Sequence, residues 1–227
     1  MFAAGRHQGG RHHLGLAADR KPAGTAFRRR RRAVAVAAVS LAIPAITFVA
    51  LSSPATAAQP LARATLVDVR GVEVGKVVFK GVGKYANRVK VDINAPKAPN
   101  LGSFHGLHIH TTGACDPEPS GSTLVPFGSA GGHFNPDPVQ SHGAHAGDLP
   151  SVLLTASGEA YAEVETARFD VSSLLDADGS AVVLHAAPDN FANIPTRSPY
   201  PPAPDATTLA TGDAGGRYAC GVVEAEK

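Results

Sequence analysis

The stretch that decides the fold is Leu107–Thr111, which reads Leu-His-Ile-His-Thr. Apolar and polar residues alternate along it, and this alternation is typical of a half-buried β-strand. In such a strand Leu107 and Ile109 point into the core, while His108 and His110 share the other face, about 7 Å apart. Two imidazoles on one face can converge on one metal ion, although a single His-x-His pair is weak evidence.

The same alternation recurs along the chain and predicts an all-β fold. It is present in residues 64–69, 76–82, 88–93, 160–169, 181–185 and 219–223. The only helical pattern, Val171–Leu175, is too short to count. Between the strands lie two long loops, residues 112–150 and 186–217, and loops of this length in a compact domain are usually functional. With 24 glycines and 18 prolines, the chain favours a sandwich or flattened barrel and excludes a helical bundle.

The charge is distributed unevenly and divides the chain into two parts. The sequence has 21 basic and 19 acidic residues in 227. Residues 1–57 contain nine of the basic residues and one acid, whereas residues 58–227 contain twelve basic and eighteen acidic residues. We therefore expect one folded domain, residues 58–227, with a net charge of −6, which argues against nucleic-acid binding.

Residues 1–57 are typical of an export signal. The basic run Arg28–Arg32 precedes the uncharged stretch Ala33–Leu51, and Ala55 and Ala57 form an A-x-A cleavage site. We expect cleavage after Ala57 and a location outside the cytoplasm, in the cell envelope or secreted. An uncleaved membrane anchor is the alternative, against which Pro44 argues, and the paired arginines leave a twin-arginine route open.

The sulfur-containing residues constrain the chemistry further. Cys115 and Cys220 are the two cysteines, and in an exported chain they most simply form one disulfide, with two free thiols as the weaker alternative. Met1 is the single methionine, so the expected mature chain has none. Copper sites that need a thioether ligand are therefore excluded.

Histidines carry the clearest functional signal. Residues 58–227 contain seven of them, all between positions 105 and 185. His185 ends a second apolar strand, His133 lies in the loop sequence GGHFNP, and His142, His145 and Asp148 form a cluster of zinc-like ligand types. We expect His105 to be structural and to hydrogen-bond the backbone near the site.

Six short motifs, taken together and in order, resemble the copper/zinc superoxide dismutase family. They extend over about residues 61–223 and are GLHIH (106–110), GGHFNP (131–136), HG (142–143), AGDLP (146–150), VLHA (183–186) and GDAGGRYACG (212–221). The segment DNFANIP (189–195) more locally resembles exported actinobacterial enzymes. The fold that this resemblance implies is an eight-stranded antiparallel Greek-key barrel.

The resemblance also implies roles for individual residues. Arg217 matches the arginine beside copper, Asp189 matches an aspartate that links a copper histidine to a zinc histidine, and Cys115 and Cys220 match the family disulfide. His133 matches the imidazolate that bridges the metals. The implied copper ligands are His108, His110, His133 and His185, and the implied zinc ligands are His133, His142, His145 and Asp148.

Two departures from the family pattern bear on the metals and the substrate. Only Gly143 and Ala144 separate His142 from His145, so the loop must turn tightly, which a glycine permits. Some relatives have lost zinc and keep copper alone. The second long loop is rich in proline and lacks the lysines with which many relatives attract superoxide.

The implied activity is the disproportionation of superoxide to oxygen and hydrogen peroxide by copper cycling between Cu(II) and Cu(I), with a bridged zinc. A non-catalytic, extracytoplasmic copper- or zinc-binding module on the same fold is the main alternative, and a structural barrel with a vestigial site is another. Superoxide is the expected partner, with no stable membrane partner if the signal is cleaved. A homodimer is possible, with Phe191 and Tyr200 in a subunit contact or in the copper channel wall.

Overall fold

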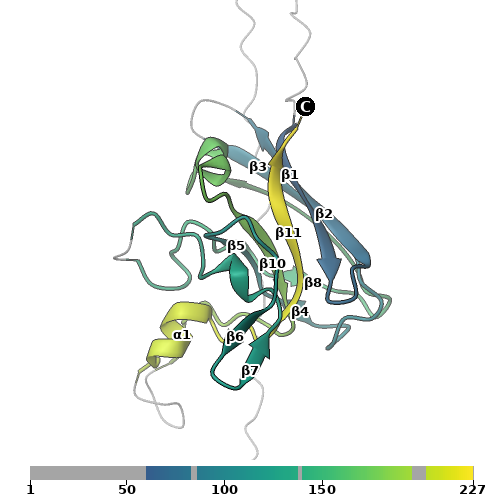
Figure 1. Ribbon diagram of the computed structural model, residues 1–227, viewed down its shortest axis with the longest axis vertical. Coiled ribbons are helices and arrows are strands. Elements are labelled where there is room, and N and C mark those ends of the chain that lie inside the picture. Colours follow the sequence, from purple (N-terminus) through teal and green to yellow (C-terminus); the bar gives the residue numbers. More distant parts are fainter. Residues whose placement is uncertain (1–59, 83–85, 138–139, 196–202, 227) are drawn as a thin grey trace, which may run out of the picture. The chain divides into compact units, whose positions relative to one another are not determined.

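The computed structural model describes residues 60–82, 86–137, 140–195 and 203–226, and nearly all their regular structure is β-strand (Figure 1). The first strands are β1 (Pro60–Asp68), β2 (Glu73–Gly81), β3 (Asn87–Asn94), β4 (Phe104–His105), β5 (Leu107–His110), β6 (Glu118–Ser120) and β7 (Thr123–Val125). The remaining strands are β8 (Val152–Leu153), β9 (Glu159–Thr166), β10 (Ala181–His185) and β11 (Arg217–Ala225). The helical segments are α1 (Ala206–Thr211) and 3₁₀ turns at Gly128–Ala130 and Val171–Leu175. The predicted all-β class is confirmed.

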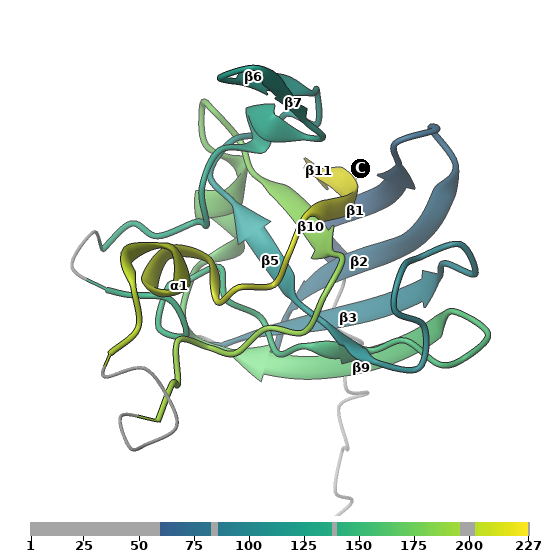
Figure 2. The same ribbon diagram turned by 90° about the horizontal axis from the view of Figure 1, so that it is seen from below.

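Seven strands form one antiparallel sheet in the order β5-β10-β11-β1-β2-β3-β9, and the sheet curls around the core (Figure 2). The short strands β4 and β8 pair separately, Phe104 with Leu153 and His105 with Val152. Because β4 leads into β5 and β8 leads into β9, this pair links the two edges of the large sheet. The fold is therefore the expected antiparallel barrel, with seven strands in the main sheet because β4 and β8 form a ladder of their own.

The core follows directly from the alternation in the sequence. On β3, Val89, Val91 and Ile93 are buried, while the residues between them are more exposed. Leu107 and Ile109 of β5 are buried in the same core, as predicted from their strand face. Each of the seven stretches predicted as strands overlaps a strand of the main sheet, and four of them extend one to three residues past its end.

A disulfide fixes the first long loop to the last strand. Cys115 and Cys220 are bonded, with 5.8 Å between their Cα atoms, so the predicted pairing is confirmed. Around it a small second cluster buries Phe127, Ala130 and Val183. The bond therefore holds the 3₁₀ turn at Gly128–Ala130 against β10 and β11.

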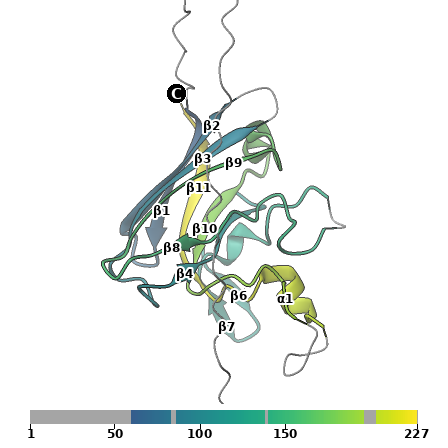
Figure 3. The ribbon, with the colours of Figure 1, turned by 180° about the vertical axis from the view of Figure 1, so that it is seen from behind.

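The helix α1 was not predicted, and it holds the second long loop against the first. Asp205 caps its N-terminus by accepting a hydrogen bond from the Thr208 backbone N–H at 2.8 Å. Figure 3 shows α1 beside the loop that leads to residue 150, and the His142 backbone N–H donates to the carbonyl of Leu209 at 2.8 Å. The two predicted functional loops therefore converge.

Two predictions fall on the N-terminal segment. Residues 1–57, with the expected export signal and its alternative, an anchor, lie outside the described residues, and so does Tyr200. In the part of the chain that the structure describes, no helix has the length and apolar character needed to cross a membrane.

Candidate metal centre

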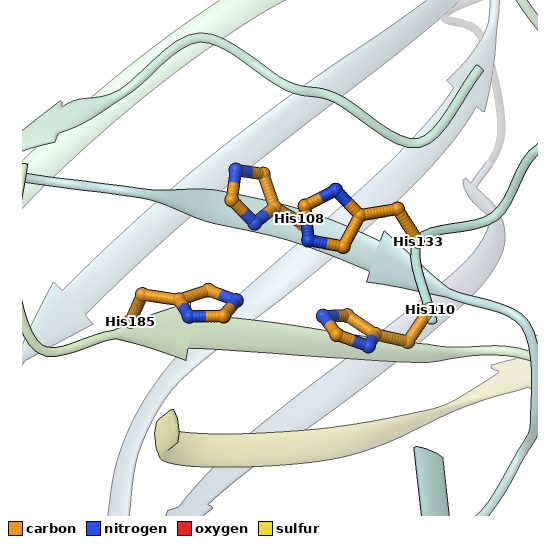
Figure 4. Close-up of side chains that lie close together, drawn as sticks. All are labelled: His108, His110, His133 and His185. Carbon is orange, nitrogen blue, oxygen red and sulfur yellow. The ribbon is translucent and has the colours of Figure 1, made fainter. Parts of the chain in front are cut away.

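Four histidines from three parts of the fold turn their rings toward one another (Figure 4). His108 and His110 come from β5, and His185 comes from the end of its antiparallel neighbour β10. His133 comes from the first long loop, where an isolated β-bridge pairs it with His110. One ligand nitrogen from each of the four lies within 4.8 Å of the others. The sheet register thus brings together residues that are up to 77 positions apart.

Hydrogen bonds at the far side of three of these rings determine which nitrogen faces the centre. His108 Nε2 bonds Asp189 Oδ2 at 2.8 Å, His110 Nδ1 bonds the carbonyl of Gly131 at 2.9 Å, and His185 Nδ1 bonds the carbonyl of Gly215 at 3.0 Å. Since each oxygen needs a donor, each of these nitrogens carries the proton of a neutral ring. The opposite nitrogen of each ring then holds a free lone pair.

These lone pairs are the test of whether the residues fit copper. His108 Nδ1, His110 Nε2 and His185 Nε2 are buried and have no hydrogen-bond partner among the described residues. Buried polar atoms without partners are rare, and three of them converging on one point are explained by a bound cation. Imidazole nitrogens are ligands that copper accepts, so the residues fit the metal.

A second group adjoins the first and shares His133. Ligand atoms of His108, His133, His142 and Asp148 also lie within 4.8 Å of one another. Asp148 Oδ1 is 2.9 Å from His133 Nδ1 and 3.2 Å from His142 Nδ1. The two Nδ1 atoms lie 3.2 Å apart, an arrangement that a shared cation accounts for. Two histidines and a carboxylate fit zinc.

His145 lies at the edge of this second group. Its Nδ1 is 3.3 Å from Asp148 Oδ2 and is a buried atom without a hydrogen bond among the described residues. The group of four residues whose ligand atoms lie within 4.8 Å of one another contains His108 and does not contain His145. The sequence did not indicate that His108 approaches both groups, because spacing along a strand says nothing about rings across the site.

The short spacing between His142 and His145 depends on Gly143 and Asp148. Gly143 has a φ of +86°, a conformation that glycine adopts without strain, and a Cβ there would lie 2.7 Å from the carbonyl oxygen of Phe191. Asp148 Oδ2 accepts hydrogen bonds from the backbone N–H groups of Gly143 at 2.7 Å and His145 at 3.0 Å. The tight turn expected at Gly143 is therefore present.

Asp189 hydrogen-bonds one histidine of each metal group without being assigned as a ligand itself. One oxygen bonds His108 Nε2 at 2.8 Å and the other bonds His142 Nε2 at 2.7 Å. Gly212 ends α1 against this pair, and a Cβ at that position would lie 2.0 Å from Asp189 Oδ1. Both histidines are therefore oriented by one buried carboxylate, in the arrangement expected for Asp189.

Burial and neighbouring charges shift the pKa values of the site residues in different directions. Burial lowers the pKa of His133 to about 4 and that of His185 to about 3, and it lowers the pKa of His110 well below its ordinary value. Burial opposes ionisation of Asp148 and Asp189, but hydrogen bonds from the histidines outweigh it and lower both carboxyl pKa values. Those same carboxylates outweigh burial at His142 and raise its pKa to about 9.

These shifts predict that the metal-free protein loses stability as the pH falls from 6.5 toward 4. The unfolded chain takes up protons on His110, His133 and His185 near pH 6.5, while the folded protein keeps them neutral. The free energy of unfolding should therefore fall by about 1.4 kcal/mol per pH unit for each. His142, whose pKa is raised to about 9 in the folded protein, is protonated in both states below about pH 6 and adds no slope there.

Urea unfolding of the metal-free protein at pH 6, 5.5 and 5 measures this slope. The variant His110→Gln removes one of the three groups and should lower the slope by about a third. Stability that does not change with pH in this window would contradict the burial of neutral imidazoles.

Arg217 and the predicted copper ligand His110 hydrogen-bond the same backbone carbonyl. Arg217 Nη2 donates to the carbonyl of Gly131 at 2.5 Å, and the same oxygen accepts from His110 Nδ1 at 2.9 Å. Its Nη1 donates to the carbonyls of Phe127 and Gly128. Burial lowers the pKa of the guanidinium, which still carries its charge at neutral pH.

For two residues next to the site, His105 and Phe191, the sequence indicates only a general role. His105 is fully buried, its Nδ1 bonds the carbonyl of His185 at 2.8 Å, and it belongs to neither group, in line with its expected structural role. Phe191 was expected in a subunit contact or in the copper channel wall. Its ring stacks on His142, with centroids 6.2 Å apart and planes 19° apart.

The curled antiparallel sheet and the two adjoining histidine groups that share His133 define a β-barrel metalloprotein with room for two neighbouring ions. Comparison with known proteins agrees with this class. Residues 73–223 match the family described as "Copper/zinc superoxide dismutase (SODC)". The chain belongs to the copper/zinc superoxide dismutase family.

Individual relatives extend the match over most of the domain. The superoxide dismutase [Cu-Zn] of Mycobacterium tuberculosis is 38% identical over 166 residues, which cover 70% of this chain and 68% of the relative. The enzyme of the same description from Deinococcus radiodurans is 32% identical over 184 residues, covering 77% and 90%. The solved structure of the Cu/Zn superoxide dismutase from Brucella abortus superposes with a TM-score of 0.55 at 26% identity, covering 71% and 98%.

Proposed function

We propose that the protein is a superoxide dismutase, which converts two superoxide anions and two protons to oxygen and hydrogen peroxide. The observation that carries this function is the set of buried histidine nitrogens that converge without hydrogen-bond partners among the described residues. The family membership and the named relatives support the same activity. A non-catalytic metal-binding module is less well supported, because all four histidines and Arg217 are present at the site.

We assign copper to His108, His110, His133 and His185, and zinc to His133, His142, His145 and Asp148. Bound copper would supply a one-electron couple that accepts an electron from one superoxide and returns it to a second. Neutral imidazoles suit both oxidation states, and residues 58–227 contain no methionine that could serve as a sulfur ligand.

The other residues hold the substrate, the protons and the ring orientations. His133 directs Nδ1 to Asp148 at 2.9 Å, and its second nitrogen can take up a proton and donate it to the peroxide product. The low pKa of its buried ring, about 4, favours release of that proton. Asp189 keeps His108 and His142 in the orientations that ligation requires.

Arg217 is the residue that we assign to substrate attraction. Superoxide is an anion, and residues 58–227 carry a net charge of −6, so the protein as a whole repels it. The guanidinium lies beside the Gly131 carbonyl, which it shares with His110. A fixed positive charge in this place attracts the anion locally.

The substitution Arg217→Ala is expected to lower the second-order rate constant about tenfold or more and to flatten its dependence on ionic strength. Arg217→Lys keeps the charge and should retain part of the salt dependence. Stopped-flow decay of superoxide at several salt concentrations measures both effects, with Arg88→Ala as a control, since Arg88 pairs with Glu165 on the sheet surface. An unchanged salt dependence in Arg217→Ala would place the attraction elsewhere.

We also propose that residues 1–57 direct export and that the protein acts outside the cytoplasm, in the cell envelope or secreted. The support is the sequence pattern: a basic run, an uncharged stretch and the A-x-A site at Ala55–Ala57. Mass spectrometry of the protein recovered from its host should give a chain beginning at Ala58. Recovery of the intact chain from membranes would favour the anchor.

For the assembly we propose a homodimer. Phe104 and Leu153 form a cross-strand pair whose side chains are both exposed, and Tyr161 is exposed on the neighbouring strand β9. Contiguous exposed apolar side chains of this kind mark interaction surfaces. Light scattering of the wild type and of Phe104→Ser tests the proposal, which a monomeric wild type would contradict.

A further inference from the structure

A cleft of about 340 Å³ opens beside the zinc half of the metal centre. Asp148, Glu165, Thr166, Arg168 and Phe191 are among the residues that line it. Of the seven residues assigned above as metal ligands, only Asp148 is part of the lining among the described residues. The cleft therefore borders the zinc group at Asp148, whose side chain is fully buried, and none of the four copper histidines is among its lining residues.

Arg168 fixes one wall of this cleft. Its Nη1 donates to the backbone carbonyls of His145 and Asp148, at 3.3 Å each. The side chain of Asp148 is itself fully buried. Arg168, two residues after the end of β9, thus connects this part of the chain to the turn that carries two of the assigned zinc ligands.

Phe191 forms the opposite wall and contacts the site at three points. Its ring stacks on His142, its backbone N–H donates to Asp189 Oδ1 at 2.7 Å, and its carbonyl packs against Gly143. Phe191 has a φ of +55° and Ala192 a φ of +56°. A bulky residue rarely adopts this conformation, so these contacts hold Phe191 in a strained position, as is common at ligand clamps.

We propose that zinc enters and leaves through this cleft and that Phe191 is the positioning residue that limits the exchange. The proposal rests on the zinc site assigned above. The apolar ring stacks on His142, the backbone N–H of the same residue bonds Asp189, and Phe191 as a whole is 39% exposed. Glu165, whose carboxylate pairs with Arg88 on the sheet surface, also lines the cleft.

The experiment follows zinc directly, without reference to activity. Zinc-loaded protein is mixed with a chromogenic chelator to measure release, and zinc-free protein is mixed with Zn²⁺ to measure uptake. Phe191→Ala should speed both uptake and release of zinc, release by about tenfold or more, at the lower end of the effects that residues around metal ligands have on a site. Phe191→Leu should show a smaller change, and copper retention should stay as in the wild type.

Two further variants make the test specific. Tyr161→Ala removes another aromatic ring, 63% exposed on β9, and should leave zinc exchange unchanged. Thr166→Phe adds bulk inside the cleft and should slow both uptake and release, so it carries the test if Phe191→Ala does not fold. Both variants are compared with the wild type at equal copper loading.

Several results would overturn the proposal. Exchange at the wild-type rate in both Phe191→Ala and Thr166→Phe would exclude this cleft as the path. Parallel loss of copper and zinc from Phe191→Ala would show general loosening of the fold instead of a zinc path. A wild-type protein that binds no zinc in equilibrium dialysis would overturn the zinc assignment together with the path, whereas normal zinc binding with unchanged rates would overturn the path alone.

Discussion

Replacement of His133 by alanine is expected to remove zinc and to lower superoxide dismutase activity more than about a hundredfold. His133 belongs to both histidine groups, and its Nδ1 is 2.9 Å from Asp148. Loss of a partner that merely orients a ligand already costs 10–100-fold in affinity or activity, so loss of a shared ligand should cost more. The substitution also removes the ring that we assign to proton transfer.

The matched control for this variant is His145→Ala. His145 contacts Asp148 at 3.3 Å but is not part of the copper group. It should lower zinc affinity and leave the copper content at the wild-type value, whereas His133→Ala should affect both metals. Metal content after dialysis and superoxide decay measure the difference. Equal effects of the two variants on copper would contradict the assignment of His133 as the shared ligand.

The double substitution Cys115→Ser/Cys220→Ser is expected to lower the free energy of unfolding by about 4–5 kcal/mol. The disulfide joins residues 105 positions apart, and closing a loop of that length restricts the unfolded chain by this amount in the chain-entropy model. It also ties to β11 the turn whose Phe127 and Gly128 carbonyls accept hydrogen bonds from Arg217. Urea unfolding of the metal-free protein at pH 7 measures the loss.

Reduction provides the control for the disulfide prediction. Reduced wild type should be destabilised by the same amount as the double variant, and a reductant should leave the double variant unchanged. A loss of less than about 1 kcal/mol in both would contradict the loop-closure account, because the model assigns several kcal/mol to a loop of this size.

Of the strands that carry the ligands, β5 alternates apolar residues and histidines over its whole length, whereas β10 is a run of apolar residues that ends in His185. Leu107–His110 could therefore be predicted, since the residues that point inward are apolar and those that point to the site are histidines. The gathering of these histidines into two groups came from the resemblance of the ordered motifs to a known family, because spacing alone leaves the partner strands open. The register of β5 with β10 then brings His185 to the same place.

The features that could not be predicted depend on backbone hydrogen bonds and on short secondary-structure elements. The carbonyls of Gly131 and Gly215 determine which nitrogen of His110 and His185 faces the centre, and a carbonyl leaves no mark in the side-chain sequence. The helix α1 has six residues, too few for a helical period, although Asp205 before it and Gly212 after it are capping signals that could have indicated it. The stacking of Phe191 on His142 could not be predicted, because it depends on how the second long loop lies against the first.

The most direct test of the central assignment is stopped-flow decay of superoxide by the copper-loaded protein, with and without added zinc. We expect fast decay that requires copper, persists when zinc is also bound, and disappears in His133→Ala. No decay in protein that demonstrably holds copper at one ion per chain would contradict the enzyme and leave a metal-binding module on the same fold.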